Sequence, residues 1–478
     1  MITQRTHLHP QSDERLRRLA LHSILVHRFD DSTDALAESV FAYARERMLL
    51  DPPPLDAPRS EVELGAAVGP TVTPEGLGGD EALRRFVDVL APSCISTDHP
   101  RYLSFIPTAP TEASTLFDLV VSASCLYGGS WMEGAGAVHA ENEALRWLSG
   151  LAGLPEGSGG VFVPGGSVGN LSALVAARHR ARRQLDPADP PPRRWLVACS
   201  AHTHSSIVSA ADVMDVDLLE IPVDAAGRLT GPAVAAALDA QDPRDTVLAV
   251  VATAGTTNFG IVDDLDGVGR VCAERGVWFH VDAAYGGAGL AAPSVRPLFA
   301  GIERADSFVV DPHKWLFAPF DCCALIYRDP EDGRHAHTQH AGYLDVLTSA
   351  EERSPSDYAI GLTRRARGLP FWFSLAVHGT RAYTDAIERT IAVARHAAEE
   401  IRRRPYLGLL RDPDLSVVVY RRNGWGPTDY HAWSARLLKE GTAFVVPTTH
   451  EGETVSRFAV VNPATTEADV TAILDTMA

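Results

Sequence analysis

The sequence predicts an α/β protein built on a mostly parallel, seven-stranded sheet, and two observations lead to this fold class. From about residue 110, short β-branched runs alternate with alanine- and leucine-rich helical stretches, which is typical of parallel strands covered by helices on both faces. The chain of 478 residues is also long enough for a large core and two or three domains. The candidate strands are 160–163, 195–199, 217–222, 247–253, 277–281, 307–310 and 324–327.

Three regions are expected along the chain. Residues 1–109 form a helical N-terminal segment, because apolar residues between 12 and 50 recur at helical spacing until Pro52-Pro53-Pro54. Residues 110–374 form the large α/β domain, and residues 375–478 a small α+β domain. In the small domain we expect helices at 376–403 and 430–440 and strands at 415–420, 444–447 and 456–461.

Composition excludes several classes of protein. The formal charge of −18 argues against a nucleic-acid partner, because phosphate binding needs clustered positive charge. No apolar run reaches the roughly 18–20 residues of a membrane span, so no membrane association is expected. The six cysteines show no metal-binding spacing, and neither do the histidines, so no metal site is expected. Free thiols indicate a reducing, cytoplasmic compartment.

Lys314 is the most informative residue of the chain. Only two of the 43 basic residues are lysines, Lys314 and Lys439. Arginine replaces lysine as a surface cation but not as a nucleophilic amine, because its guanidinium stays protonated. Lys314 follows the apolar run 307–310 within Asp311-Pro312-His313-Lys314-Trp315, where a structural charge has no purpose. It is therefore predicted to be a reactive amine that forms a Schiff base.

Four further features follow predicted strands, whose carboxyl ends gather ligands in an open α/β sheet. Each alone also fits an ordinary turn or helix cap. Together they provide a phosphate cradle, a carboxylate for a pyridinium nitrogen, a stacking imidazole and spare hydroxyls, which are what pyridoxal 5′-phosphate requires. The four features are Pro164-Gly165-Gly166-Ser167, Asp282 at the end of 278–282, His202 and His204 after Cys199, and Thr253 to Thr257.

The chain resembles the group II pyridoxal-phosphate-dependent amino-acid decarboxylases, above all the aromatic-L-amino-acid decarboxylase branch. The resemblance implies fold type I, an amino-acid substrate, and a homodimer that exchanges the N-terminal segment and has its active site near the subunit interface. It rests on His99-Pro100-Arg101-Tyr102, Phe105-Ile106-Pro107-Thr108, 164–170, 201–206, 280–285, 311–315 and Arg457-Phe458-Ala459-Val460.

The resemblance also implies roles for single residues. Lys314 resembles the lysine that binds the cofactor, and Asp282 the partner of its pyridine nitrogen. One position departs from the pattern, because many relatives have asparagine where this chain has Asp311; an aspartate there would have to be protonated or turned away from the phosphate. The remaining matches are His313 beside the lysine, His204 as the stacking ring, Ala284 beneath the cofactor, Gly166 and Ser167 at the phosphate, and Thr257 near the ring hydroxyl.

The segment 328–358 is polar and turn-rich, fits neither helix nor strand well, and is expected to be a mobile lid. Tyr343 within it matches the loop tyrosine of the family, which returns a proton to the substrate after CO2 leaves. His335, His337 and His340 in the same segment are interpreted as mobile, solvated side chains and not as metal ligands.

The substrate is the least determined part of this interpretation. Phe105, Ile106 and Thr108 match a substrate-lining segment of relatives, and Gly129 stands where aromatic relatives have a bulky ring, which suggests room for an indole. Glu112 and Glu133 leave a cationic diamino acid open, and acidic or branched substrates also stay open. An aminotransferase or aldehyde synthase on the same fold and a non-catalytic regulator are the remaining alternatives.

Overall fold

The structure is a computed structural model that describes residues 29–188, 190–340 and 352–478. The chain divides into two compact units, one ending at Ser96 and the other comprising Thr97–Ala478. Among the described residues, no helix has the length and apolar character needed to cross a membrane.

The N-terminal unit is helical in its described residues, and the helical segment expected over residues 1–109 stays a prediction. Its helices are α2 (Asp31–Met48), α3 (Glu61–Val68) and α4 (Gly79–Arg85). Asp30 caps α2 by accepting hydrogen bonds from the backbone N–H groups of its first turn, and Ser60 and Glu63 form a capping box at α3. None of the three helices buries a residue. Capping therefore defines the starts of α2 and α3, whereas α4 begins after Gly78 without a side-chain cap.

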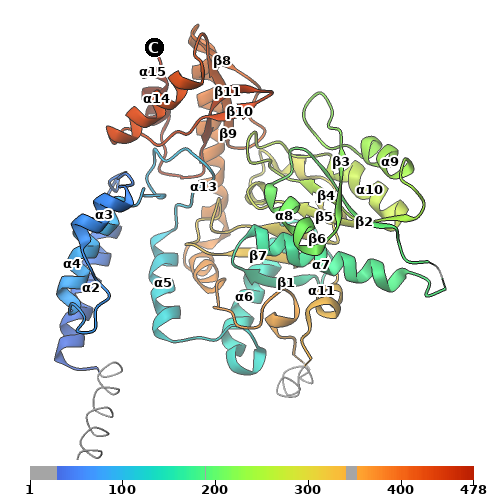
Figure 1. The fold of residues 1–478 in the computed structure, drawn as a ribbon, viewed down its shortest axis with the longest axis horizontal. Helices are drawn as coiled ribbons and strands as arrows, with labels where there is room; N and C mark the ends of the chain where they lie inside the picture. Colours follow the sequence, from blue (N-terminus) through green and yellow to red (C-terminus); the bar gives the residue numbers. More distant parts are fainter. Residues whose placement is uncertain (1–28, 189, 341–351) are drawn as a thin grey trace, which may run out of the picture. The chain divides into compact units, whose positions relative to one another are not determined.

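The second unit contains a seven-stranded sheet in the order β1-β7-β6-β5-β4-β2-β3 (Figure 1). Only β7 runs antiparallel to its neighbours, so the mostly parallel sheet is confirmed. Each predicted strand forms within two residues of its expected limits. The strands are β1 (Gly159–Val163), β2 (Arg194–Ser200), β3 (Asp217–Ile221), β4 (Asp245–Thr253), β5 (Trp278–Asp282), β6 (Ser307–Val310) and β7 (Cys323–Tyr327).

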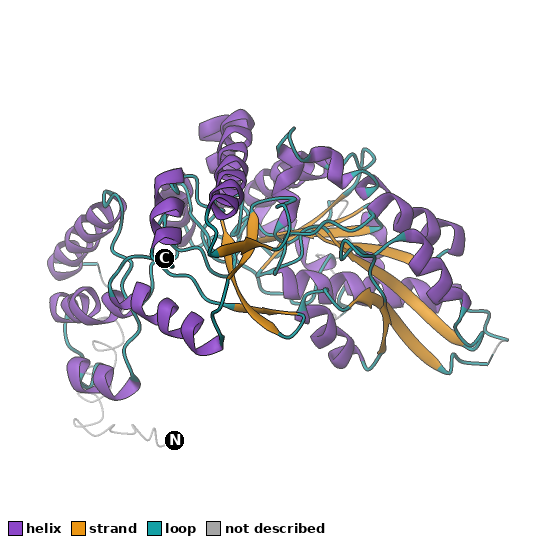
Figure 2. Ribbon diagram, turned by 90° about the horizontal axis from the view of Figure 1, so that it is seen from above, coloured by secondary structure: helices purple, strands orange, loops and turns teal. Residues whose placement is uncertain are grey.

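Helices cover both faces of this sheet (Figure 2). Successive side chains of a strand point to opposite faces, so Val250 of β4 joins one buried cluster and Val251 the other. The first cluster includes residues of α6 (Trp131–Leu151), α9 (Gly231–Asp239) and α10 (Leu265–Arg275). The second includes residues of α7 (Gly166–Gln184) and α8 (Ser205–Met214).

The C-terminal part adds a four-stranded sheet in the order β10-β11-β9-β8. The long α13 contacts helices beside the large sheet as well as β8, β9 and α15. The expected domain boundary at 374/375 falls inside this helix, and the division into two domains here stays a prediction. The elements are α5 (Glu112–Ala123), α13 (Leu369–Arg403), β8 (Leu407–Leu409), β9 (Val417–Arg422), α14 (Pro427–Lys439), β10 (Thr448–His450), β11 (Glu453–Ala459) and α15 (Glu467–Asp475).

The strand predicted at 444–447 is wrong. Phe444 forms only an isolated parallel bridge to Tyr102, and the strand of this region is β10, immediately after Pro447. The backbone of Phe444 bonds to Arg101 and Leu103, at 3.0 Å each. Pro447 has no N–H to extend a ladder, so the pairing ends before it.

Part of the segment expected to be a lid is a helix, α11 (Pro330–His337). Asp329 caps it by accepting a hydrogen bond from the Glu331 backbone N–H, with proline at the first helical position. His337 is buried and donates from Nε2 to the Ser172 carbonyl at 3.0 Å, so the interpretation of this histidine as mobile and solvated is wrong. The part of the chain that the structure describes holds no candidate metal cluster. Tyr343 lies outside the described residues.

Candidate active site

A cavity of about 330 Å³ lies at the carboxyl ends of the parallel strands. The segments after β1, β2, β4, β5 and β6 all contribute to its wall, as expected for a ligand site in an α/β sheet. The structure gathers here every residue that the sequence assigned to the cofactor. These are Gly166, Ser167, His204, Thr257, Asp282, Ala284, His313 and Lys314.

One end of the cavity is formed by the start of α7. Gly165 occupies the N-cap position with no side-chain cap, so the first backbone N–H groups of the helix point outward with its positive dipole end. A Cβ on Gly166 would lie 3.3 Å from both Ala284 Cβ and Asp311 Oδ2. Glycine therefore permits the close approach of the backbone that an anion cradle needs.

Lys314 lies in the cavity beside Asp311. Its Nζ is 2.9 Å from Asp311 Oδ2, and the lysine side chain keeps 23% of its surface exposed. Burial would lower the pKa of Lys314, but the Asp311 carboxylate raises it above its ordinary value. Burial would likewise raise the pKa of Asp311, but Lys314 and His313 hold it below its ordinary value. The two side chains therefore form a charged pair.

His313 is neutral near pH 7, because burial lowers its pKa. Its Nδ1 accepts a hydrogen bond from the Cys322 backbone N–H at 2.9 Å, which leaves the ring proton on Nε2. Nε2 lies 3.6 Å from Asp311 Oδ2. The ring thus directs an N–H toward the same carboxylate that pairs with Lys314.

Asp282 is held by a buried network at the other end of the cavity. Asn170 donates from Nδ2 to Asp282 Oδ2 at 2.9 Å and accepts at Oδ1 from His280 Nε2 at 2.9 Å. Burial lowers the pKa of His280 to about 4, so the ring is neutral and carries its proton on Nε2. Its Nδ1 accepts from Ser307 Oγ at 2.8 Å. The network fixes the carboxylate where a protonated pyridine nitrogen would bind.

His204 is fixed by the start of α8, which it caps. Its Nδ1 accepts from the Ser206 backbone N–H at 3.2 Å and lies 2.9 Å from Ser206 Oγ. Asn170 Nδ2 also donates to Ser206 Oγ at 2.9 Å. Asn170 therefore connects the elements that hold His204 and Asp282.

Sequence reasoning assigned no role to Asn170 or His280. Both had a usable signal. Asn170 follows Gly166 by four residues, so it lies on the face of α7 that begins at the cradle. His280 precedes Asp282 by two residues in β5 and therefore points to the same face of the sheet.

The predicted substrate residues lie outside the lining of this cavity. Thr108 donates from Oγ1 to the Ala318 carbonyl at 2.7 Å, which ties its segment to the turn after Lys314. Ile106 packs against the main core, whereas Phe105 is 58% exposed. Phe105 has a left-handed φ of 51°, and its carbonyl accepts a hydrogen bond from Arg457 at 2.5 Å.

The space expected at Gly129 is filled by Tyr127. A Cβ on Gly129 would lie 2.3 Å from Tyr127 Oη and 2.4 Å from Cζ. The tyrosine hydroxyl donates to the Leu362 carbonyl at 3.1 Å, which holds the ring there. The expectation that Gly129 enlarges a pocket is therefore wrong, because a neighbouring aromatic ring occupies the volume that a side chain would take.

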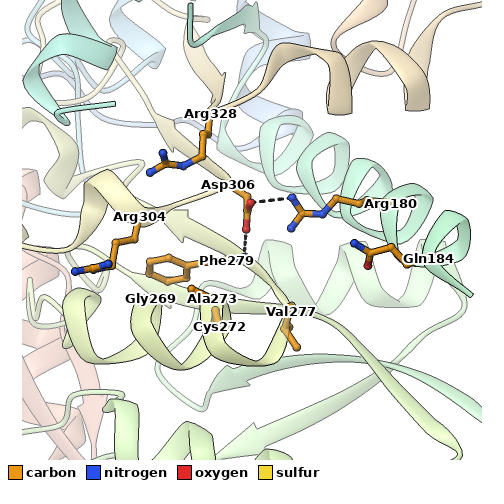
Figure 3. Close-up of a pocket in the computed structure, with 11 residues that line it drawn as sticks. Arg180, Gln184, Gly269, Cys272, Ala273, Val277, Phe279, Arg304, Asp306 and Arg328 are labelled. Atoms are coloured by element: carbon orange, nitrogen blue, oxygen red, sulfur yellow. Dashed lines mark hydrogen bonds and ion pairs between the residues drawn. The ribbon is translucent and has the colours of Figure 1, made fainter. Parts of the chain in front are cut away.

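A separate cavity of about 460 Å³ lies near the amino ends of β5 and β6, opposite the site (Figure 3). Arginines line it, but Arg180 pairs with Asp306 at 2.8 Å and Arg304 with Asp266 at 2.8 Å. The charges of both arginines are thus balanced within the protein.

The main cavity fits pyridoxal 5′-phosphate. It offers an uncapped helix start for a phosphate, Asp282 for a ring nitrogen and the Lys314 amine for the aldehyde carbon. The bound cofactor would supply an electron sink at the substrate's α-carbon. Fold and site together define a fold type I enzyme that depends on this cofactor.

Comparison with known proteins identifies the family. The pyridoxal-dependent decarboxylase conserved domain matches residues 79–423. The chain therefore belongs to the pyridoxal-dependent decarboxylases, and it is an amino-acid carboxy-lyase that uses pyridoxal 5′-phosphate.

Several relatives are similar along most of their length. The L-2,4-diaminobutyrate decarboxylase of Rhizobium meliloti is 32% identical, over 79% of this chain and 77% of the relative. The aromatic-L-amino-acid decarboxylase of Bacillus atrophaeus is 30% identical, over 79% of this chain and 80% of the relative. The TDC of Oryza sativa, solved with PLP and tryptamine, superposes with a TM-score of 0.86 at 26% identity, over 94% of this chain and 98% of that one.

Proposed function

We propose that the protein decarboxylates an aromatic L-amino acid to the amine and CO2, with its active site in the cavity around Lys314. The observation that carries the proposal is the convergence of Lys314, Asp282 and His204 on one cavity at the strand ends. The three supply an amine, an anion and an aromatic ring, the groups that orient a pyridine aldehyde for this chemistry.

Each predicted site residue has a proposed role. Lys314 would hold the cofactor covalently through its amine, and Asp282 would keep the ring nitrogen protonated. His204 and Ala284 would hold the cofactor ring between them. After CO2 leaves, the Tyr343 hydroxyl returns a proton to the α-carbon, as the resemblance implies. Gly166 and Ser167 hold the phosphate, Thr257 lies near the ring hydroxyl, and His313 orients the lysine turn.

An aromatic substrate is supported by the similarity to the Bacillus and Oryza proteins. The relative from Rhizobium favours a diamino acid as a second candidate.

The charged side chains near the site give little support to a diamino-acid substrate. A cavity of about 830 Å³ shares His204 and Thr257 with the site and is lined by carboxylates, but Asp224 pairs with Arg228 and Asp414 with Arg411. Of the two glutamates expected near the substrate, Glu133 accepts from Ser130 Oγ at 2.7 Å, and neither lines the cavity.

A homodimer is proposed from the resemblance and supported by the N-terminal unit. Its helices bury none of their residues, although Val40, Phe41 and Val62 are large apolar side chains exposed by 38% or more. Apolar helix surfaces of this kind gain stability when they pack against a partner. A cytoplasmic location is proposed from the six cysteines, which are all free thiols.

The function is tested with carboxyl-labelled amino acids. The purified protein is loaded with pyridoxal 5′-phosphate and given all common L-amino acids, DOPA, ornithine and 2,4-diaminobutyrate in separate reactions. We expect labelled CO2 with the matching amine, detected by mass spectrometry, for tryptophan ahead of phenylalanine, tyrosine and DOPA. Preference for a cationic, acidic or branched amino acid contradicts the aromatic assignment. Keto acid without CO2 indicates an aminotransferase, aldehyde with peroxide an aldehyde synthase, and no product a regulator.

A further inference from the structure

Asp311 places a carboxylate against the phosphate cradle. Both of its oxygens lie 3.3–3.4 Å from the position of a Cβ on Gly166, the first residue of α7. The residue is 2% exposed, and among the described residues its Oδ1 accepts no N–H or O–H hydrogen bond; the Cys323 thiol, a weak donor, is its further partner. The carboxylate thus faces the position where the cofactor phosphate would bind.

Asp311 is held in this place by its burial and by its contact with Lys314 Nζ at 2.9 Å, on a backbone that is itself fixed. Its N–H donates to the Ala284 carbonyl at 3.0 Å, and its carbonyl accepts from the Lys314 N–H at 2.9 Å. An aspartate at this position can be accommodated by rotation or by protonation, and protonation is the one that keeps the side chain where the structure places it. An ionised carboxylate would repel a phosphate at such a distance in a buried site.

The source of the proton is the residue paired with Asp311. Lys314 must lose its ammonium proton before Nζ attacks an aldehyde. The nearest base is Asp311 Oδ2, at 2.9 Å. A proton transfer within this pair removes both charges, so it frees the nucleophile and neutralises the carboxylate in one step.

We propose that Asp311 accepts the ammonium proton of Lys314 when the cofactor attaches, keeps it, and as a neutral carboxylic acid donates a hydrogen bond to the phosphate. The balance is complete: the ammonium, the carboxylate and the aldehyde give a C=N bond, a carboxylic acid and one water. The aldehyde oxygen leaves in the water with two of the three ammonium hydrogens, and the third remains on Asp311. This inference rests on the proposed placement of the cofactor at Lys314 and Gly166.

The surroundings of Asp311 favour the neutral form once Lys314 is consumed. The titratable groups that face it are Lys314, the neutral His313 and the thiol of Cys323. Burial raises the pKa of the Cys323 thiol well above its ordinary value, so this group brings no charge. Without the ammonium, burial is the main remaining influence on Asp311, and burial favours a protonated carboxyl.

The first experiment measures the proton directly. Infrared difference spectra of the apoprotein before and after loading with pyridoxal 5′-phosphate should show a new carbonyl band of a protonated carboxylic acid that shifts in D2O. The band should be absent from D311N and present in D357N, a buried aspartate outside the site. Loading without a new band overturns the proposal, as does a band that persists in D311N.

The second experiment distinguishes the contribution of the cofactor phosphate to binding from that of the cofactor ring. Affinities for pyridoxal 5′-phosphate and for pyridoxal are compared from about pH 6 to about pH 9 by absorbance titration. In the wild type the ratio of the two affinities should fall with rising pH, by about tenfold for each unit above the pKa of the bound carboxyl. In D311N this fall should be absent, because an amide donates a hydrogen bond at every pH; the titration of the phosphate itself is common to both proteins.

An equal pH dependence of the ratio in both proteins overturns the proposal. Borohydride reduction and peptide mapping distinguish the two levels of failure. A cofactor attached elsewhere than Lys314 refutes the proposed site itself, whereas attachment at Lys314 without the carboxyl band refutes only the role of Asp311.

Discussion

Asn170 donates one amide hydrogen to Asp282 Oδ2 at 2.9 Å, within the buried network that lines the cavity. The same amide group donates to Ser206 Oγ, which lies 2.9 Å from His204 Nδ1. One side chain of α7 thus positions both Asp282, proposed to bind the ring nitrogen of the cofactor, and His204, proposed to stack on its ring.

Replacing Asn170 with alanine should weaken both the fold and the reaction. Asp282 and Ser206 each lose a buried donor, which costs about 1–3 kcal/mol in the free energy of unfolding. Loss of orientation at Asp282 and His204 should lower CO2 release by about tenfold to a hundredfold. Urea unfolding and labelled CO2 measure the two effects, with the exposed Asn258→Ala as control. Wild-type values for both would show that the network has no positioning role.

His280 predicts a specific dependence of stability on pH. Burial lowers its pKa to about 4, below the value of about 6.5 in an unfolded chain. Between these values the unfolded state binds a proton that the folded state does not, so stability falls as pH decreases from about 6.5 to about 4. This single residue should account for roughly 3 kcal/mol of the loss. Its contribution is fully present above about pH 6.5.

The His280 prediction is tested with His280→Gln, whose amide also donates to Asn170 but does not titrate. Urea unfolding at about pH 7 and about pH 5 should show a smaller loss of stability for the variant than for the wild type. Equal losses in both proteins would mean that His280 is not neutral in the folded state.

Gly129→Ala should destabilise the protein through Tyr127. The new Cβ would lie 2.3 Å from Tyr127 Oη, so the ring must leave its place and its hydrogen bond to Leu362. Overpacking of this kind costs about 1–3 kcal/mol. In the background Tyr127→Ala, the same change at Gly129 should cost much less, and a double-mutant cycle by thermal unfolding measures the coupling. Additive effects would contradict the contact.

Lys314→Arg should abolish CO2 release while leaving thermal unfolding close to that of the wild type, because arginine keeps a cation beside Asp311 but has no nucleophilic amine. Borohydride reduction of the wild type, followed by peptide mapping, should place the pyridoxyl group on Lys314. Lys439→Arg is the matched control and should retain activity. A label on Lys439 would refute the assignment.

Tyr343→Phe should suppress amine formation and increase aldehyde and peroxide, because an α-carbon that receives no proton reacts with dioxygen. The amine, aldehyde and peroxide are measured on the same aromatic substrate, and Tyr406→Phe provides a tyrosine control in the C-terminal part. Amine formation at the wild-type rate would give the loop another role.

The parts of the fold that depend on local pattern were predictable. The strand at 307–310 forms with the predicted limits because all four residues are buried and the run is bounded by polar residues. The strand expected at 444–447 fails because its partner is Arg101 to Leu103, more than 300 residues away, and no local pattern reveals that pairing. The Asp329-Pro330 pair is a typical helix start, but α11 has few apolar residues at helical spacing, so the helix was not predicted.

The same division applies to the site. Strand ends, glycines and a rare lysine located Lys314, Asp282 and the Gly166 cradle, because sheet topology alone brings these positions together. The role of Asn170 depends on a contact to His280 across 110 residues of sequence, and the filling of the space at Gly129 depends on a rotamer of Tyr127. Spacing places Asn170 and His280 on the right faces of their elements, but the contacts themselves follow from tertiary packing.

The placement of the two lysines has a practical consequence for handling the protein. Lys439 is exposed at the end of α14, whereas Lys314 lies in the cavity that the cofactor would fill. Apart from a terminal amine, reagents that acylate amines would therefore find one accessible side chain on the loaded protein. A fluorophore or a surface attached through Lys439 would be distributed uniformly across a preparation, with the reaction centre left unmodified.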